Sequence, residues 1–307
     1  MNAPRSHGRL VLTHSDIYAF LACRRWFDWS YNRDFRLPEV EWGARALGSR
    51  VHAAVQRFWH GEDVVAAHEE LAKTAVETVE ADPSSPPFAV EELYRDIILG
   101  RNACRAFREW VEREGPYDGF TVIGVEQVLE AEVGEGVLLR GRADLLLQRD
   151  SDGAIFVDDL KTSSRYRAGV REGLERSYQH SVYLMLATAQ NPETLIGGAY
   201  YTVLYKYRNP AASTGPLVER WMVPASRRTL VVRQAQINFI VNEITRMMAM
   251  SDELGSVVAY PTPQDRCRWC DFAKPCELYD DAPLAARAML DSEYQRGGRH
   301  DRYAREE

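Results

Sequence analysis

Two short runs decide how this chain folds: Gly141-Arg142-Ala143-Asp144-Leu145-Leu146-Leu147 and Val157-Asp158-Asp159-Leu160-Lys161-Thr162. The first lies in a mostly apolar stretch, and the apolar pattern resumes at residue 154. Between them, residues 150–153 form a cluster of turn-favouring residues. The sequence therefore predicts two strands that pair as a hairpin.

This hairpin brings three charged side chains together. Asp144 is expected near the end of the second strand, where Asp159 and Lys161 lie two residues apart and so project from one face. Two close carboxylates repel each other, and both stay ionised most easily when a divalent cation lies between them. Mg²⁺ or Mn²⁺ suits such oxygen ligands. The alternative is a surface cluster of acids at a strand end.

Composition limits the class of protein. The chain has 307 residues, 45% hydrophobic and 27% charged, which is ordinary for a globular protein of one large or two small domains. It has no apolar run of ~18 residues and no apolar leader core, so we expect a cytoplasmic protein. The net charge of −7 does not favour nucleic-acid binding, which would depend on local basic patches. Five cysteines in such a protein favour metal binding over disulfides.

Two helices precede the hairpin and carry further candidate residues. Thr13-His14-Ser15-Asp16 has the form of a capping box and predicts a helix that contains Cys23. A second helix is predicted over residues 43–60, where Gly48 and His52 are four apart and share a face. A single histidine on a helix is more often structural or solvated. Residues 62–80 and 90–114 are predicted to be helices that either wall a substrate channel or serve as plain scaffold.

The pattern Asp144…Asp159-x-Lys161 on adjacent strands resembles the core of the PD-(D/E)XK nucleases, although Ala143 stands where that family often has proline. Gly48-x-x-x-His52 and Gln179-x-x-x-Tyr183 occur in the order typical of the RecB-like branch. That branch includes the nuclease domains of bacterial helicase-nucleases and the CRISPR-associated RecB-like exonucleases.

The resemblance implies an α/β fold with a restriction-endonuclease-like core, in which helices flank a mixed sheet. We expect an N-terminal helical region over 1–119, the nuclease core over 120–250, a cysteine-rich segment over 251–285 and a charged, flexible tail over 286–307. The catalytic residues implied are Asp144, Asp159, Lys161, Gln179 and Tyr183. The implied ligands of Mg²⁺ or Mn²⁺ are His52, Asp144, Asp159 and the backbone carbonyl of Leu160. Glu126, on the preceding strand, either adds an acid to this site or faces solvent.

The C-terminal segment contains Cys267, Cys270 and Cys276 in a C-x2-C-x5-C pattern. Three clustered thiolates need a fourth ligand. In the RecB-like iron-sulfur nucleases one cysteine precedes the core and three close the chain, so Cys23 matches the missing position. The resemblance thus implies a [4Fe-4S] cluster. A structural zinc ion accepts the same four thiolates. Cys104 is left over and is expected to pack in the helical region.

The function implied is a metal-dependent DNA exonuclease acting on single-stranded ends, with helicase, recombination or CRISPR adaptation proteins as partners. No Walker A motif is present, so no helicase motor is expected. Candidate contacts to the DNA backbone are Arg24, Arg25, Arg165, Arg167 and Lys206. Two other interpretations stay open: a nuclease-silent DNA- or partner-binding subunit, and a metal-stapled scaffold with no role on nucleic acid, which the negative charge favours.

Overall fold

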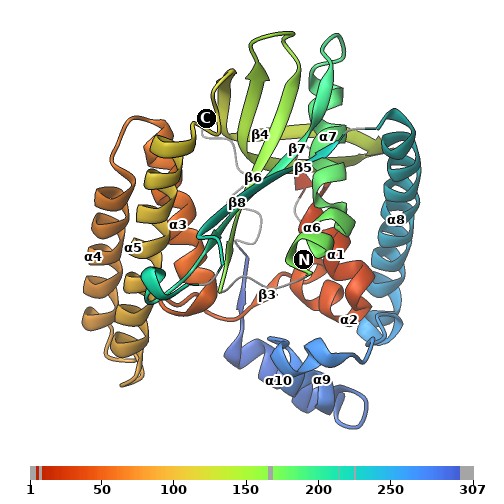
Figure 1. Ribbon diagram of the computed structural model, residues 1–307. Coiled ribbons are helices and arrows are strands. Elements are labelled where there is room, and N and C mark those ends of the chain that lie inside the picture. The colour runs from red at the N-terminus through yellow and green to blue at the C-terminus, as the bar shows by residue number, and fades with distance from the viewer. Residues whose placement is uncertain (1–4, 7–8, 165–168, 214, 225, 298–307) are drawn as a thin grey trace. The chain divides into compact units, whose positions relative to one another are not determined.

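The computed structural model describes residues 5–6, 9–164, 169–213, 215–224 and 226–297. The chain forms two compact units, each assembled from separate stretches of sequence (Figure 1). The first unit comprises residues 1–39, 128–142 and 226–307, and the second comprises residues 40–127 and 143–225. Strands β4 (Phe120–Gly134) and β5 (Val137–Arg149) contribute to both units.

The second unit contains a mixed sheet. The second half of β5 pairs antiparallel with β6 (Ile155–Ser163), with Leu145 opposite Asp158, which confirms the predicted hairpin. Strand β6 runs parallel to β7 (Ile196–Tyr205), and β7 pairs antiparallel with β8 (Val218–Pro224). Most side chains of β6 and β7 are buried, as expected for strands covered on both faces.

Helices cover both faces of this sheet. On one face Leu160 and Leu204 pack into an apolar core with residues of α3 (Gly43–Trp59), α4 (Val64–Ala81) and α5 (Ala89–Glu114). These three helices lie side by side in Figure 1 and contact one another in pairs. On the other face lies α7 (Tyr178–Gln190), whose His180 meets the ring of Tyr201 on β7. A short helix, α6 (Val170–Arg176), and a 3₁₀ turn (Pro210–Ala212) complete the unit.

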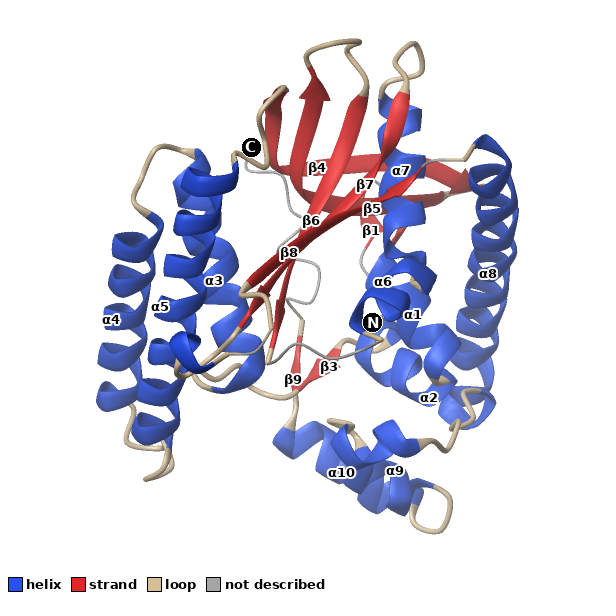
Figure 2. Ribbon diagram, viewed as in Figure 1, coloured by secondary structure: helices blue, strands red, loops and turns tan. Residues whose placement is uncertain are grey.

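The first unit is mainly helical (Figure 2). Its strand β2 (Arg9–Thr13) runs parallel to the first half of β5 and antiparallel to β1 (Arg5–Ser6), while β3 (Phe35–Arg36) pairs with β9 (Gln295–Arg296). The helical elements are α1 (His14–Ala22), α2 (Arg24–Phe27), the π-helix η1 (Asp28–Asn32), α8 (Arg227–Leu254), η3 (Gly255–Val258), η4 (Asp265–Trp269), α9 (Ala273–Tyr279) and α10 (Pro283–Glu293).

Hydrogen bonds explain where the N-terminal helix starts and how it is held. The capping box predicted at Thr13 is present, because Thr13 and Asp16 exchange backbone-to-side-chain bonds. Further on, the buried carboxylate of Asp28 accepts hydrogen bonds from the hydroxyls of Ser251 and Ser256 at 2.8 and 2.5 Å. A buried carboxylate needs such donors, so these bonds fix η1 against α8 and η3.

The structure differs from the sequence-based expectation in three places. The first helix ends at Ala22 because Cys23 adopts an extended backbone, and α2 starts after it. The sequence also predicts one helix over about 172–190, and in the structure this stretch is divided, with Ser177 capping α7. Residues 286–293, expected to belong to a flexible tail, form most of α10 and bury Ala286 and Leu290. Within the described residues no helix is both long and apolar enough to cross a membrane.

Candidate active site

The β5–β6 hairpin places Asp144 beside the second predicted motif. The backbone N–H of Leu160 donates a hydrogen bond to Asp144 Oδ2 at 2.6 Å. This bond fixes the carboxylate of Asp144 against the strand that carries Asp159 and Lys161. The sequence predicted this proximity, and the register of the hairpin produces it.

Helix α3 brings His52 to the same place. At Gly48 the helix approaches β6 so closely that a Cβ atom there would lie 3.3 Å from the hydroxyl of Thr162. One turn later, His52 Nδ1 lies 3.7 Å from Asp144 Oδ1. Burial lowers the pKa of His52, but the Asp144 carboxylate outweighs it and the pKa is raised. For Asp144, burial raises the pKa, yet His52 opposes it and the net direction is down.

Asp159 lies in a network formed by β6 and α7. Lys161 Nζ is 2.5 Å from Asp159 Oδ2, and Gln179 Nε2 donates to Asp159 Oδ1 at 3.0 Å. Gln179 Nε2 also lies 3.5 Å from the hydroxyl of Tyr183, one helical turn along α7. Burial raises the pKa of Asp159 to about 6; Asp144 adds to this rise and Lys161 opposes it. The structure thus brings together Asp144, Asp159, Lys161, Gln179, Tyr183 and His52.

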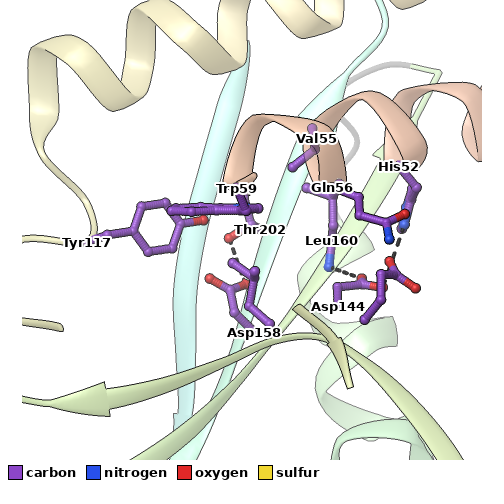
Figure 3. A pocket seen from close by; sticks show the side chains of 11 residues that line it. His52, Val55, Gln56, Trp59, Tyr117, Asp144, Asp158, Leu160 and Thr202 are labelled. Atoms are coloured by element: carbon purple, nitrogen blue, oxygen red, sulfur yellow. Dashed lines mark hydrogen bonds and ion pairs between the residues drawn. The ribbon is translucent and has the colours of Figure 1, made fainter. Parts of the chain in front are cut away.

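A pocket opens beside Asp144 and His52 (Figure 3). Its walls include Trp59 and Tyr117, whose ring centroids are 4.8 Å apart, and the side chain of Gln56. Sequence reasoning did not propose Gln56, although its position four residues after His52 puts it on the same helical face. The other lining residues are Val55, Glu126, Leu145, Asp158, Leu160 and Thr202.

Glu126 lines this pocket with an unusual backbone. Its φ is +51°, in the left-handed region that a residue other than glycine rarely adopts. Such a residue in the middle of a strand redirects the chain locally, as strand irregularities beside functional sites do. Glu126 therefore contributes to the pocket wall and not simply to an exposed strand face.

The basic residues predicted to contact DNA lie in different surroundings. Arg165 and Arg167 lie outside the described residues. The guanidinium of Arg24 lies 3.7 Å from the centroid of the Phe20 ring. Arg25 is buried and pairs with Asp280 at 2.9 Å, and Lys206 is only 8% exposed. The two buried side chains are therefore not free surface cations in this conformation.

The four cysteines of the first unit lie near one another and receive N–H groups. Cys23 and Cys267 accept from the backbone N–H groups of Thr262 and Gln264, at 3.4 and 3.5 Å. Arg25 Nη1 lies 3.6 Å from Cys276 Sγ, and Cys270 accepts from the backbone of Phe272. Cys23 also interacts electrostatically with Cys270 and Cys276.

N–H groups directed at sulfur stabilise thiolates, which are the metal-binding form of cysteine. Burial nevertheless raises the pKa of Cys270 and of Cys276, so the four cysteines fit a thiolate-bound metal centre by residue type and not by a lowered pKa. The side chains are not, however, at coordinating positions: no group of three His, Cys, Asp or Glu residues arranged to hold a metal ion occurs in the described part of the chain. Cys104 belongs to the second unit and is fully buried in its apolar core, as expected.

Comparison with known proteins agrees with this geometry. The family model of the PD-(D/E)XK nuclease superfamily matches residues 11–277, which is most of the chain and includes every residue of the site. A search of curated proteins gave no significant match. The matched range spans the carboxylates and the lysine of β5 and β6. The chain belongs to the PD-(D/E)XK nuclease superfamily.

Proposed function

We propose that the protein is a metal-dependent DNA exonuclease that hydrolyses phosphodiester bonds at single-stranded ends. The observation that carries the nuclease assignment is the convergence of Asp144, Asp159 and Lys161 at one place on the hairpin, with His52 3.7 Å from Asp144. The preference for DNA ends rests on the resemblance to RecB-like exonucleases.

The residue types of the site are those that hold one divalent cation, although no three His, Cys, Asp or Glu side chains of the described residues stand in a metal-holding arrangement. His52, Asp144, Asp159 and the backbone carbonyl of Leu160 would hold Mg²⁺ or Mn²⁺. When bound, such an ion lowers the pKa of a water ligand and neutralises charge on the phosphate. Asp144 already carries the fixed negative charge, because His52 lowers its pKa. Gln179 holds the Asp159 carboxylate in place through the 3.0 Å hydrogen bond.

Lys161 is the cation of the site. Its ammonium lies against Asp159 in the present arrangement and shares the face of β6 from which that carboxylate projects. From there it would orient the attacking water or stabilise charge that develops on the phosphate in the transition state. Tyr183, beside Gln179, would help to order the same face of α7.

We propose further that Cys23, Cys267, Cys270 and Cys276 hold a [4Fe-4S] cluster with a structural role. The support is the four neighbouring cysteine side chains, the N–H groups directed at their sulfur atoms and the family arrangement of one early and three late cysteines. A single zinc ion is the alternative for the same ligands. Proteins of recombination, repair or CRISPR adaptation are the partners that the resemblance suggests.

The test is degradation of linear DNA by the anaerobically purified chain with Mg²⁺ or Mn²⁺. The wild-type protein should release nucleotides, whereas Asp159→Asn and Lys161→Ala should lose on the order of 10²-fold or more of the rate. Asp152→Asn, at the turn of the same hairpin, is the matched control and should cut normally. A folded wild-type protein that binds DNA but never cuts it would instead support the nuclease-silent subunit.

A further inference from the structure

Three aromatic rings and one arginine form a stripe on the first unit: Tyr18 on α1, Trp26 on α2, and Arg266 and Trp269 on η4. The ring centroids of Tyr18 and Trp26 are 6.0 Å apart in an edge-to-face arrangement. The guanidinium of Arg266 lies 4.0 Å from the centroid of Trp26 and 5.2 Å from that of Tyr18. We call these four residues the aromatic stripe.

Trp269 extends the stripe beyond Arg266. The segment Asp265–Trp269 is a 3₁₀ helix, in which residues three apart lie on the same side. Arg266 and Trp269 are three apart, so Trp269 lies on the side of η4 that carries the stacked arginine. Its side chain is 84% exposed, and that of Tyr18 is 52% exposed.

Two features distinguish the stripe from ordinary exposed apolar side chains. Single exposed rings are common on protein surfaces, but here the rings of Tyr18 and Trp26 adjoin each other around Arg266, and Trp269 follows on the same 3₁₀ helix. The arginine is also available for a ligand: no carboxylate of the described residues forms an ion pair with Arg266. Its planar face rests on Trp26 while its N–H groups remain available to an anion.

We propose that the aromatic stripe binds the unpaired bases of a DNA single strand, which rests on the nuclease function proposed above. Bases stack on Tyr18 and Trp269, and a phosphate of the same strand contacts Arg266. Rings alternating with arginine are the chemistry by which proteins hold single strands without reading their sequence. The positive charge on Arg266 is complementary to the phosphate, which favours a nucleic acid over an apolar protein segment.

Binding of a fluorescent oligothymidylate to the full-length protein, measured by anisotropy without divalent metal so that the strand is not cut, tests the stripe. Trp269→Ala and Tyr18→Ala should each bind about tenfold more weakly, since each removes a stacking platform. Leu284→Ala and Phe239→Ala are matched controls in the same unit, with side chains 84% and 65% exposed, and both should bind as the wild type does.

Two further measurements separate stacking from charge. Arg266→Ala should reduce the slope of log affinity against log salt by about 0.7, the value for one phosphate contact on a single strand, whereas Trp269→Ala should leave the slope unchanged. An oligonucleotide of abasic sites should bind the wild type and Trp269→Ala equally. If Trp269→Ala lost as much affinity for the abasic strand as for the normal strand, stacking of bases on Trp269 would be overturned.

The outcome is independent of the nuclease assay. A wild-type protein that degrades DNA while all three stripe variants bind single strands normally would overturn the stripe and leave the nuclease proposal standing. If the wild-type protein does not cut DNA but these variants lose single-strand binding, the nuclease proposal is overturned and the aromatic stripe stands. Because Trp269 lies between Cys267 and Cys270, metal content must be compared in each variant; Tyr18→Ala lies outside the cysteine segment and gives the same test without that risk.

Discussion

Asp158 and Asp159 are consecutive on β6, yet they serve opposite faces of the sheet. Asp158 Oδ2 pairs with Arg220 Nε at 3.0 Å and its other oxygen accepts from Thr202, whereas Asp159 pairs with Lys161 and Gln179. The alternation of side chains along a strand separates them. Asp158 lines the pocket while Arg220 and Thr202 of the sheet hold its carboxylate, and Asp159 belongs to the network with Lys161 and Gln179; substitutions should distinguish the two roles.

Arg220→Met should unfold at markedly lower urea concentration, with a loss of about 3–5 kcal/mol in the free energy of unfolding. The reason is that Asp158, which is buried, would lose the partner of its charge. Asp158→Asn in the Arg220→Met background should recover part of that loss, because no unpaired buried charge remains. Equal stability of Arg220→Met and the wild type would contradict the proposed support role.

In the metal-free protein the contribution of Asp159 to stability should grow as the pH falls from 7 to 5, whereas buried His68, whose pKa burial lowers to about 4, acts in the opposite direction. Burial raises the pKa of Asp159 to about 6, so in this range the folded protein holds a proton that the unfolded chain lacks. The raised pKa of His52 acts in the same direction. The gain due to Asp159 should be about 1 kcal/mol. The urea midpoints of the wild type and of Asp159→Asn, compared at pH 7 and pH 5, isolate the contribution of Asp159. If both proteins showed the same pH dependence, the raised pKa of Asp159 would be contradicted.

DNA cleavage should show the opposite pH dependence. A protonated Asp159 or His52 is a poor metal ligand, so activity should decline below about pH 6. Raising the metal concentration should restore part of the activity at low pH, because metal and proton compete for the same atoms. The rate is measured at saturating DNA, and a rate that stays constant from pH 7.5 to 5 would be the contrary result.

His52→Ala should weaken metal binding more than DNA binding. It removes a nitrogen donor, and it also leaves Asp144 without the group 3.7 Å away that lowers its pKa. A nitrogen ligand also predicts that Mn²⁺ supports cleavage at least as well as Mg²⁺, which prefers oxygen. Calorimetric titration of each variant with Mn²⁺ measures the effect. Gln56→Ala, on the same face of α3, keeps the donor set and serves as the control.

Each of four single substitutions by alanine should release iron: those at Cys23, Cys267, Cys270 and Cys276. The wild-type protein, purified anaerobically, should carry about four irons and absorb near ~400 nm. Cys104→Ser should keep the full iron content, since Cys104 lies in the apolar core of the second unit and burial raises its pKa to about 12. If the protein held one zinc per chain and no iron, the proposal of a cluster would be wrong and the zinc alternative would hold. If Cys23→Ala retained its iron, Cys23 would not be a ligand.

Glu126→Gly should stabilise the protein by about 1 kcal/mol while it slows cleavage. Glycine adopts the φ of +51° without the steric cost that glutamate has there, but the carboxylate that lines the pocket is lost. Asp34→Gly is the matched control, because Asp34 has a φ of +56° in the first unit. It should gain stability at full activity. A Glu126→Gly enzyme that cuts at the wild-type rate would assign the strained backbone to folding alone.

The sequence by itself determined the local elements and predicted candidate residues for the site. Alternating and 3.6-residue patterns predicted the hairpin, α3 and α5 because these depend on short-range spacing. Asp159-x-Lys161 was found from spacing along one strand, whereas Gln179 and Tyr183 were singled out by the resemblance to RecB-like nucleases. The break at Cys23 was not predicted, since the residues around it form helix on both sides.

Only the tertiary structure decided which partners these elements meet. Strand β2 joins the first half of β5 across more than a hundred residues of chain, a pairing that no local pattern specifies. The sequence likewise did not predict that Arg25 is buried against Cys276 or that Lys206 is buried in the second unit, because arginine and lysine are usually exposed. The raised pKa of Asp159 has the same origin: desolvation and the approach of Asp144 exist only after packing has closed around both carboxylates.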